Sequence, residues 1–238
     1  LSLHDALPIS PCINGDYPWL SSRVPLIAPN LFVDYDDAYV VELLIELFAS
    51  HPQLLSLIAE IMGSAPILAE TLSRHPALID SVIYGNFYGP LPPRARLEAE
   101  LSEQMAHLPG FDQRMEQLRS FRNEKQFQAG VQFLRGMVDG VRLGHFLTDL
   151  AEVVTERLLS AILAEFEKTY GRIAGAEFAI IALGKAGSRE LTFHSDLDLV
   201  FIYRVPDFEL VSDGEKQYSA SVYYNRLAQR LVNALSAL

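Results

Sequence analysis

The sequence predicts an α+β protein that is mostly helical, with an N-terminal helical region followed by a mixed domain. Three observations lead to this fold class. Apolar residues recur at three- and four-residue spacing over much of residues 34–170, which is the period of amphipathic helices. Two apolar runs of strand length, residues 178–183 and 197–203, are rich in Val, Ile and aromatic residues. A last helical pattern then begins at Glu215.

Composition restricts the class of protein. The 238 residues, half of them hydrophobic, are enough for one sizeable core or two modest domains. The formal net charge of −11 argues against nucleic acid as the main partner, because phosphate backbones require clustered basic groups. The single cysteine, Cys12, forms no internal disulfide, and no stretch reaches the roughly 20 apolar residues of a membrane span. We therefore expect a cytoplasmic protein with no nucleic-acid and no membrane partner.

The first 33 residues have no helical pattern. Residues 1–9, LSLHDALPI, are the translation of a nucleotide stretch that resembles a common DNA-sequencing adaptor, so we exclude them from fold reasoning. Residues 10–33 are rich in proline and have no apolar periodicity, which predicts an irregular lead-in. The last helical pattern reaches residue 238 without a cap, so both ends are expected to have been set by cloning or sequencing.

A helical linker region is expected over residues 34–142. Pro90–Pro93 interrupts it, and the pattern resumes at Arg94 with a second break at Pro109-Gly110. We interpret the charged stretch Arg119–Lys125 as a solvated helix face. The short helices before the first break are predicted by four stripes: Val40, Leu43, Leu44 and Leu47; Leu54, Leu57, Ile58 and Ile61; Ile67, Leu68 and Leu72; and Leu78, Ile79 and Val82.

A second domain is expected over residues 143–238. Its longest helix is predicted at Thr148–Tyr170, with Gly171 as a plausible stop. The two predicted strands and the helix from Glu215 follow. The buried lines predicted for the two helices are Leu147, Leu150, Val154, Leu158 and Ala161 for the first, and Tyr224, Leu227, Leu231, Ala234 and Leu238 for the second.

Residues 178–203, FAIIALGKAGSRELTFHSDLDLVFIY, contain the candidate chemistry. Asp196 and Asp198 stand at i and i+2, so in a strand their side chains share a face and lie about 6 to 7 Å apart. Hard oxygen ligands of this kind bind Mg²⁺ together with substrate phosphates, and paired metal ions assist phosphoryl or nucleotidyl displacement. An Asp-x-Asp pair alone is a weak signal, because exposed carboxylates are common at strand ends.

The Gly-rich turn between the two strands strengthens that signal. Glycines and a serine let the backbone approach a triphosphate closely, and a lysine neutralises phosphate charge. The turn is neither a Walker motif nor a dinucleotide fingerprint. Arg189 and Glu190, which follow it, either orient the turn or form an internal ion pair. The candidate nucleotide-binding residues are Gly184, Lys185, Gly187 and Ser188.

The order of strand, Gly-Ser turn and Asp-x-Asp strand resembles the DNA polymerase β-type nucleotidyltransferase superfamily. Within it, the wording Leu-Gly-Lys-x-Gly-x-Arg-Glu-Leu followed by Ser-Asp-Leu-Asp-Leu is similar to the glutamine synthetase adenylyltransferases, which adenylylate and deadenylylate glutamine synthetase. The resemblance covers roughly residues 31–238. Three further stretches share it: GSAPILAETLSRHPALIDSVI, RNEKQFQAGVQFLRG and LGHFLTDLAEVV.

The resemblance implies a polymerase β-like nucleotidyltransferase domain, truncated at its C-terminus, with ATP as donor and a tyrosine hydroxyl of glutamine synthetase as acceptor. Asp196 and Asp198 would be catalytic and would hold Mg²⁺, and a PII-type signalling protein would be a regulatory partner. The family's third metal-site carboxylate lies on a later strand, so the site is expected to be incomplete at Leu238. Ala186 stands where the family usually has Leu, which we expect to loosen local packing.

Three functions stay open on the sequence. The family has two similar halves, and the residues upstream of the motif favour the C-terminal, adenylylating half. The alternative is the half that removes AMP, in which inorganic phosphate attacks the adenylyl-tyrosine. A third possibility, from another class, is a non-catalytic helical interaction fragment with an incomplete nucleotide site.

Overall fold

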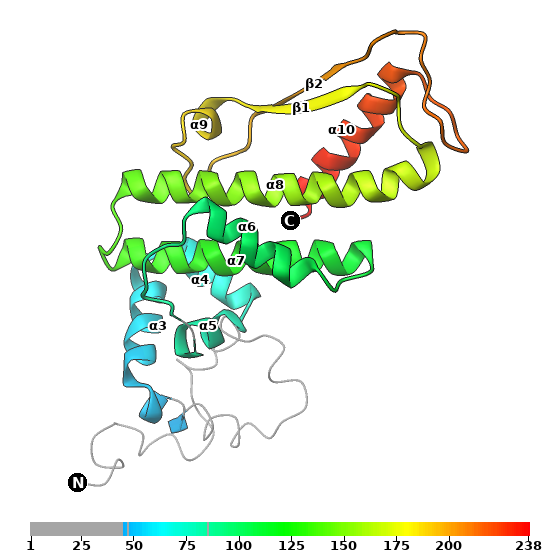
Figure 1. Ribbon diagram of the computed structural model, residues 1–238. Helices are drawn as coiled ribbons and strands as arrows, with labels where there is room; N and C mark the ends of the chain where they lie inside the picture. The colour runs from blue at the N-terminus through cyan, green and yellow to red at the C-terminus, as the bar shows by residue number, and fades with distance from the viewer. Residues whose placement is uncertain (1–44, 47, 85) are drawn as a thin grey trace, which may run out of the picture. The chain divides into compact units, whose positions relative to one another are not determined.

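The computed structural model describes residues 45–46, 48–84 and 86–238 (Figure 1). These residues belong to two units, which divide between Phe87 and Tyr88. The adaptor-like residues, the irregular lead-in, Cys12 and the stripe that begins at Val40 lie outside the described residues or largely so. The mostly helical α+β class is confirmed.

The first unit contains three short helices, α3 (Pro52–Ser64), α4 (Pro66–Arg74) and α5 (Leu78–Tyr84). Helices α3 and α4 begin with proline, whose fixed φ suits the first helical turn and whose missing N–H costs no hydrogen bond there. The stripe on α3 is confirmed, and those on α4 and α5 are confirmed in part, because Ile67, Ile79 and Val82 are only half-buried. The buried side chains are Leu54, Leu57, Ile58, Ile61, Leu68, Leu72 and Leu78.

Within the described ranges, no single helix is long and apolar enough to cross a membrane. Helices α3 and α4 reach that length and composition only when taken together, and the chain bends by 120° between them.

The helical part of the second unit consists of α6 (Arg94–Met105), α7 (Phe111–Leu134) and α8 (Gly140–Tyr170), with the predicted break at Pro109-Gly110 confirmed. Helix α8 begins at Gly140 and not at Thr148 as predicted. The carboxylate of Asp139 accepts a hydrogen bond from the N–H of Arg142 at 2.8 Å, which satisfies one of the donors that a helix start leaves unpaired. This cap explains why the helix begins before Thr148, although the residues from Gly140 onward have only weak apolar periodicity.

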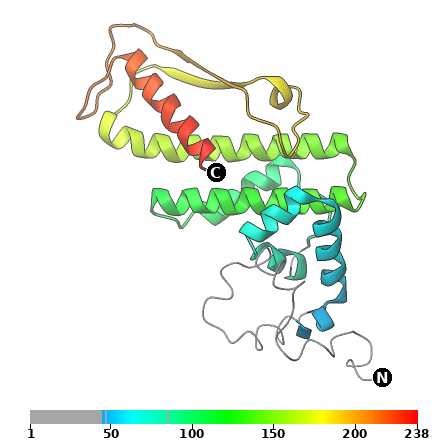
Figure 2. The ribbon, with the colours of Figure 1, turned by 180° about the vertical axis from the view of Figure 1, so that it is seen from behind.

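Helix α8 lies between the other elements of this unit. In both views of the ribbon, α6 and α7 run along one side of α8, while α10 (Ala220–Ser236) and the strands lie on the other (Figures 1 and 2). One core joins all these helices, so it spans both sides of the domain boundary expected between residues 142 and 143. The predicted line on α8 is confirmed by its buried residues: Leu147, Leu150, Val154, Leu158 and Ala161.

The interpretation of Arg119–Lys125 as a solvated face is wrong. Phe121 is fully buried, and Lys125 is only 9% exposed. The Lys125 ammonium lies 2.9 Å from a carboxylate oxygen of Glu100 on α6 and 5.3 Å from the centre of the Phe121 ring. A buried charge is tolerated where it is paired in this way. The charged residues of this stretch therefore help to hold α7 against α6.

The two strands, β1 (Glu177–Ala182) and β2 (Leu199–Arg204), pair antiparallel from Glu177↔Arg204 to Ala182↔Leu199. Both are predicted to within two residues. Their side chains alternate as expected for a half-covered sheet. Phe178, Ile180, Ala182 and Phe201 pack against the core, and the Phe178 ring stacks on Tyr224 of α10 at 5.5 Å. The opposite face is exposed, with Ile181, Val200 and Ile202 each more than 40% accessible.

The end of α8 is closed by the loop that precedes α10. The chain leaves the helix at Gly171, as predicted. Backbone N–H groups of Gly214 and Lys216 donate to the carbonyls of Tyr170 and Thr169, each at 3.2 Å. The hydroxyl of Tyr223 donates to the Gly171 carbonyl at 2.9 Å. These bonds satisfy carbonyls that a helix end would otherwise leave unpaired, and they attach α10 to α8.

We expect Tyr223→Phe to lower the free energy of unfolding by about 1 kcal/mol at pH 7, the usual value of one net hydrogen bond. Burial raises the pKa of Tyr223 from 10 to about 12. The unfolded chain therefore loses this proton before the folded chain does, so the free energy of unfolding falls as the pH rises from about 10 towards 12. Tyr223→Phe lacks this part of the slope. The measurement is the free energy of unfolding by urea for both proteins between pH 7 and about pH 12. If it falls equally with pH in both proteins, the raised pKa does not belong to Tyr223.

Candidate functional site

Asp196 and Asp198 lie in an extended segment just before β2, and not within the strand as predicted. The carbonyl of Asp198 still accepts a hydrogen bond from the N–H of Leu183 at 2.8 Å, which extends the strand ladder by one pair. Both carboxylate residues are exposed, while Leu197 between them is half-buried. This alternation is the one that the i, i+2 spacing predicts for two side chains on the solvent face.

The predicted Gly-rich turn is a single helical turn, α9 (Gly184–Gly187). The N–H of Gly187 donates to the Leu183 carbonyl and the N–H of Ser188 donates to the Gly184 carbonyl, both at 3.0 Å. These two N–H groups are therefore used inside the turn, whereas a helix start leaves its first N–H groups free to meet an anion. Ala186 is buried against the core, and the other candidate residues, Gly184, Lys185, Gly187 and Ser188, are exposed.

Gly184 brings the turn into direct contact with Asp198. Its φ is +53°, in the left-handed region, and a Cβ atom added to it would lie 2.5 Å from Oδ2 of Asp198. Only a residue without a side chain allows the carboxylate to lie this close to the backbone. The fold thus places a carboxylate oxygen, a type of atom that binds hard metal ions, beside the first residue of the turn.

The end of the turn is attached to α8 by ion pairs. The guanidinium of Arg189 binds the carboxylate of Asp149, and its Nη1 lies 3.2 Å from Oε1 of Glu152. The hydrogen bond to Asp149 raises the pKa of Arg189 above its ordinary value, so the group stays charged. The structure thus contains the internal ion pair that was one of the two roles considered for Arg189.

The same acidic face of α8 also binds α6. The guanidinium of Arg94 contacts Glu152, and it lies 2.6 Å from Glu156 and 2.8 Å from Glu98. Glu152 is therefore shared by Arg94 and Arg189. Through this shared carboxylate, α6, α8 and the segment after α9 form one network of charges.

The donor set suits Mg²⁺ held jointly with a nucleotide. In the described part of the chain, no group of three or more His, Cys, Asp or Glu side chains is arranged to hold a metal ion. Mg²⁺ in phosphate-transferring sites is usually bound by one or two carboxylates together with substrate phosphates. Asp196 and Asp198 are both exposed, and Asp198 lies beside Gly184, so the two carboxylates are compatible with that requirement.

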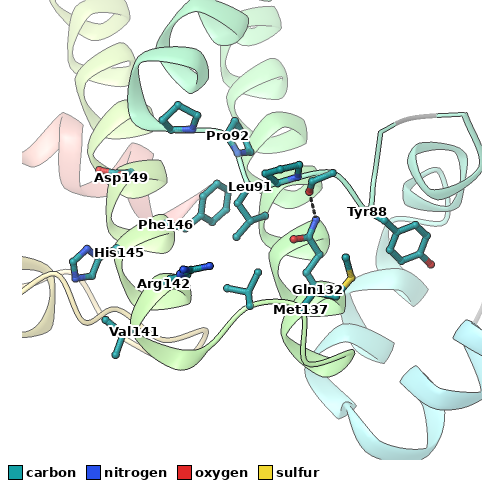
Figure 3. Close-up of a pocket in the computed structure, with 14 residues that line it drawn as sticks. Tyr88, Leu91, Pro92, Gln132, Met137, Val141, Arg142, His145, Phe146 and Asp149 are labelled. Carbon is teal, nitrogen blue, oxygen red and sulfur yellow. Dashed lines mark hydrogen bonds between the residues drawn. The ribbon is translucent and has the colours of Figure 1, made fainter.

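A pocket of about 630 Å³ lies elsewhere in the second unit, where the segment from Tyr88 to Pro93 crosses the end of α7 and the start of α8 (Figure 3). The amide of Gln132 donates to the Gly89 carbonyl at 2.8 Å across it. Sequence reasoning missed this pocket because three separate segments form it, and no pattern within one segment indicates a cavity. Asp149 lines the pocket and also binds Arg189. The pocket includes neither Asp196 nor Asp198.

Comparisons with known proteins agree with the motif. Residues 55–238 match the family model described as glutamate-ammonia ligase adenylyltransferase. The bifunctional glutamine synthetase adenylyltransferase/adenylyl-removing enzyme of Brucella suis biovar 1 (strain 1330) is 41% identical over 194 residues, which are 82% of this chain and 20% of that protein. The enzymes of the same name from Mesorhizobium japonicum and Rhodopseudomonas palustris (strain TIE-1) are 40% and 36% identical over 82% and 81% of this chain and 20% of each relative.

This chain spans about a fifth of the length of these curated relatives. The family model covers more than three quarters of the chain, including every element from α6 to α10. By its sequence, the chain belongs to the glutamate-ammonia ligase adenylyltransferase family.

Proposed function

We propose that the protein containing this chain transfers AMP from ATP to a tyrosine hydroxyl of glutamine synthetase in a Mg²⁺-dependent reaction. The observation that supports this most directly is the contact between the Asp198 carboxylate and the backbone of Gly184, which joins a metal-ligating group to the phosphate turn. The names of the relatives support glutamine synthetase as the substrate protein, since they are glutamine synthetase adenylyltransferases. The tyrosine hydroxyl as acceptor rests on the resemblance of the motif.

In this proposal, Asp196 and Asp198 hold the metal, and the turn binds the triphosphate. Lys185 is exposed within the turn, so its ammonium can neutralise phosphate charge without first leaving an ion pair of the core. When bound, Mg²⁺ neutralises the phosphate oxygens and stabilises the leaving pyrophosphate. The protein's own contribution is to align the carboxylates and the turn before the nucleotide arrives, which removes a cost of reorganisation.

The alternative function is the opposite reaction, the removal of AMP from glutamine synthetase, and one observation supports it. The relatives' name also includes adenylyl-removing activity. The same groups would then serve phosphorolysis, in which a phosphate oxygen attacks the phosphorus of the adenylyl-tyrosine. The bond from phosphorus to the tyrosine oxygen breaks, so ADP forms and the tyrosine hydroxyl is restored. A PII-type signalling protein as regulator and a cytoplasmic location complete the proposal, and they rest on the resemblance and the composition.

We expect Asp198→Asn to reduce AMP transfer by at least roughly 10²-fold, the scale of losing one preorganised group that stabilises developing charge. The amide keeps the shape of the side chain but lacks the negative charge that holds a hard cation. The measurement is transfer of labelled AMP from ATP to purified glutamine synthetase by the full-length protein with Mg²⁺.

The matched control is Asp207→Asn, in the loop after β2. Asp207 is exposed and its carboxylate accepts a hydrogen bond from the N–H of Glu209 at 2.9 Å, which an amide oxygen can also accept. We expect this variant to retain wild-type transfer. Transfer lost equally in both variants would contradict the proposed metal site. If Asp198→Asn instead abolishes phosphate-dependent release of ADP from modified glutamine synthetase and leaves AMP transfer unchanged, this chain belongs to the opposite half. A wild-type protein that is inactive in both directions, with and without Mg²⁺, would leave only the interaction fragment.

We expect Gly184→Ala to weaken binding of Mg²⁺-ATP about tenfold, which corresponds to about 1.4 kcal/mol. The added methyl group would lie 2.5 Å from the Asp198 carboxylate and must displace it. The left-handed backbone adds about 1–3 kcal/mol of strain to the folded state. Gly140→Ala is the control, because a Cβ there meets nothing within 4 Å. Equilibrium ATP binding and thermal unfolding of both variants test this, and unaltered binding in Gly184→Ala would show that the carboxylate and the turn do not act together.

A further inference from the structure

Two attachments determine where the phosphate turn lies. At its start, the ladder bond between Leu183 and Asp198 and the contact of Gly184 with the Asp198 carboxylate fix the turn to the strands. At its end, the chain must leave the turn and pass across α8 before it reaches Asp196. Any movement of this second attachment changes the distance between the turn and the two carboxylates.

The second attachment is made by Arg189 in a backbone conformation that is unusual for a residue with a side chain. Its φ is +62°, and its N–H donates to the Ala186 carbonyl at 3.2 Å. Such a conformation costs about 1–3 kcal/mol and persists only where other contacts hold it. The structure supplies these contacts through α8, since a Cβ added to Gly144 would lie 3.2 Å from Cα of Glu190 and 3.4 Å from the Arg189 carbonyl.

The guanidinium then reaches two carboxylates at once. Asp149 and Glu152 stand three residues apart on α8, and so they lie on one side of the helix, one turn apart. They are 40 and 37 residues away from Arg189 in the sequence. A planar guanidinium presents several N–H donors in a fixed fork and can bind both acids, whereas a lysine ammonium is a single point of charge.

These acids are only partly exposed, with 20% of the Asp149 side chain and 30% of the Glu152 side chain accessible. Four carboxylates, those of Asp149, Glu152, Glu156 and Glu98, surround the two guanidiniums of Arg189 and Arg94. Loss of Arg189 leaves like charges facing one another at the exit of the turn. The backbone in left-handed conformation then loses the ion pairs that oppose its strain.

We propose that Arg189 is a positioning residue, which binds Asp149 and Glu152 and thereby holds the Gly184–Ser188 turn at its working distance from Asp196 and Asp198. This inference rests on the proposed function for its consequence in catalysis. In this role, Arg189 itself contacts neither the substrate nor the metal. The side chain of Arg189 acts through the backbone of the turn, and Asp149 and Glu152 on α8 contribute to the same positioning.

The test compares Arg189→Gln, Asp149→Asn and the double variant in the full-length protein. We expect each single variant to raise the KM for ATP about tenfold and to change kcat much less. Because both substitutions break the contact between Arg189 and Asp149, their effects should not multiply, and the double variant should also show about tenfold and not a hundredfold. Arg189→Lys, which keeps the charge and loses the fork, should lie between Arg189→Gln and wild type.

The matched control is Arg204→Gln on β2. Arg204 also forms an ion pair, 2.6 Å from Glu177, but both side chains are more than 60% exposed and the pair lies at the other end of the hairpin. We expect wild-type KM for ATP in this variant. An unchanged KM in Arg189→Gln, or effects that multiply in the double variant, would overturn the proposal. So would a loss of activity that merely follows the fraction of folded protein.

A second readout does not depend on enzymatic activity. Amide hydrogen exchange in residues 183–190 should increase at least about tenfold in Arg189→Gln and stay at the wild-type rate in Arg204→Gln, while exchange in α10 stays unchanged in both. Equal exchange in residues 183–190 of the wild type and Arg189→Gln would overturn the positioning role. If exchange increases as expected but the wild-type protein neither binds ATP nor transfers AMP, the proposed function fails and the attachment of the turn to α8 stands.

Discussion

Burial of α8 on both of its sides is the constraint on which the rest of the second unit depends. Phe146, Leu150 and Leu158 are among its almost fully buried side chains, and fully burying such a side chain contributes about 1.5–3 kcal/mol. Neither α6 and α7 on one side nor α10 on the other could bury its own apolar stripe without this helix. The two-stranded sheet packs on the same core and stacks on Tyr224 of α10, which supports it because a lone hairpin is at best marginally stable in water.

The candidate site uses the same helix in a different way. Where α8 passes the exit of the turn, it presents carboxylates in place of apolar side chains, and Arg189 and Arg94 bind them. The helix thus has an apolar part that supports the fold and an acidic part that supports the turn. Since one rigid element does both, the distance between the turn and the core does not depend on a flexible linker.

Much of this architecture follows from local pattern. The stripes on α3 and α8, the break at Pro109-Gly110 and both strands follow from periodicity and from residues that interrupt helices. The motif around Asp198 is also local, because the turn and the carboxylates belong to one hairpin. For such features, the residues that decide the structure are close together in the sequence.

Other features were missed or misread because they depend on distant residues. The burial of Lys125 depends on Glu100, which belongs to another helix. The start of α8 at Gly140 depends on a cap by Asp139 more than on apolar spacing. Whether Arg189 pairs internally is decided by Asp149, 40 residues earlier. No periodicity within one segment contains this information.

The exposed apolar face of the hairpin formed by β1 and β2 bears on the solubility of the chain. Ile181 and Val200 are cross-strand partners on that face, next to Ile202. Among the residues that the structure describes, no third strand pairs with the outer edge of either strand. Apolar faces and open edges favour self-association at the concentrations used for spectroscopy. Threonine or lysine at this pair would give a more soluble version of the isolated chain, since the opposite face, with Phe178 and Phe201, would keep its contacts with the core.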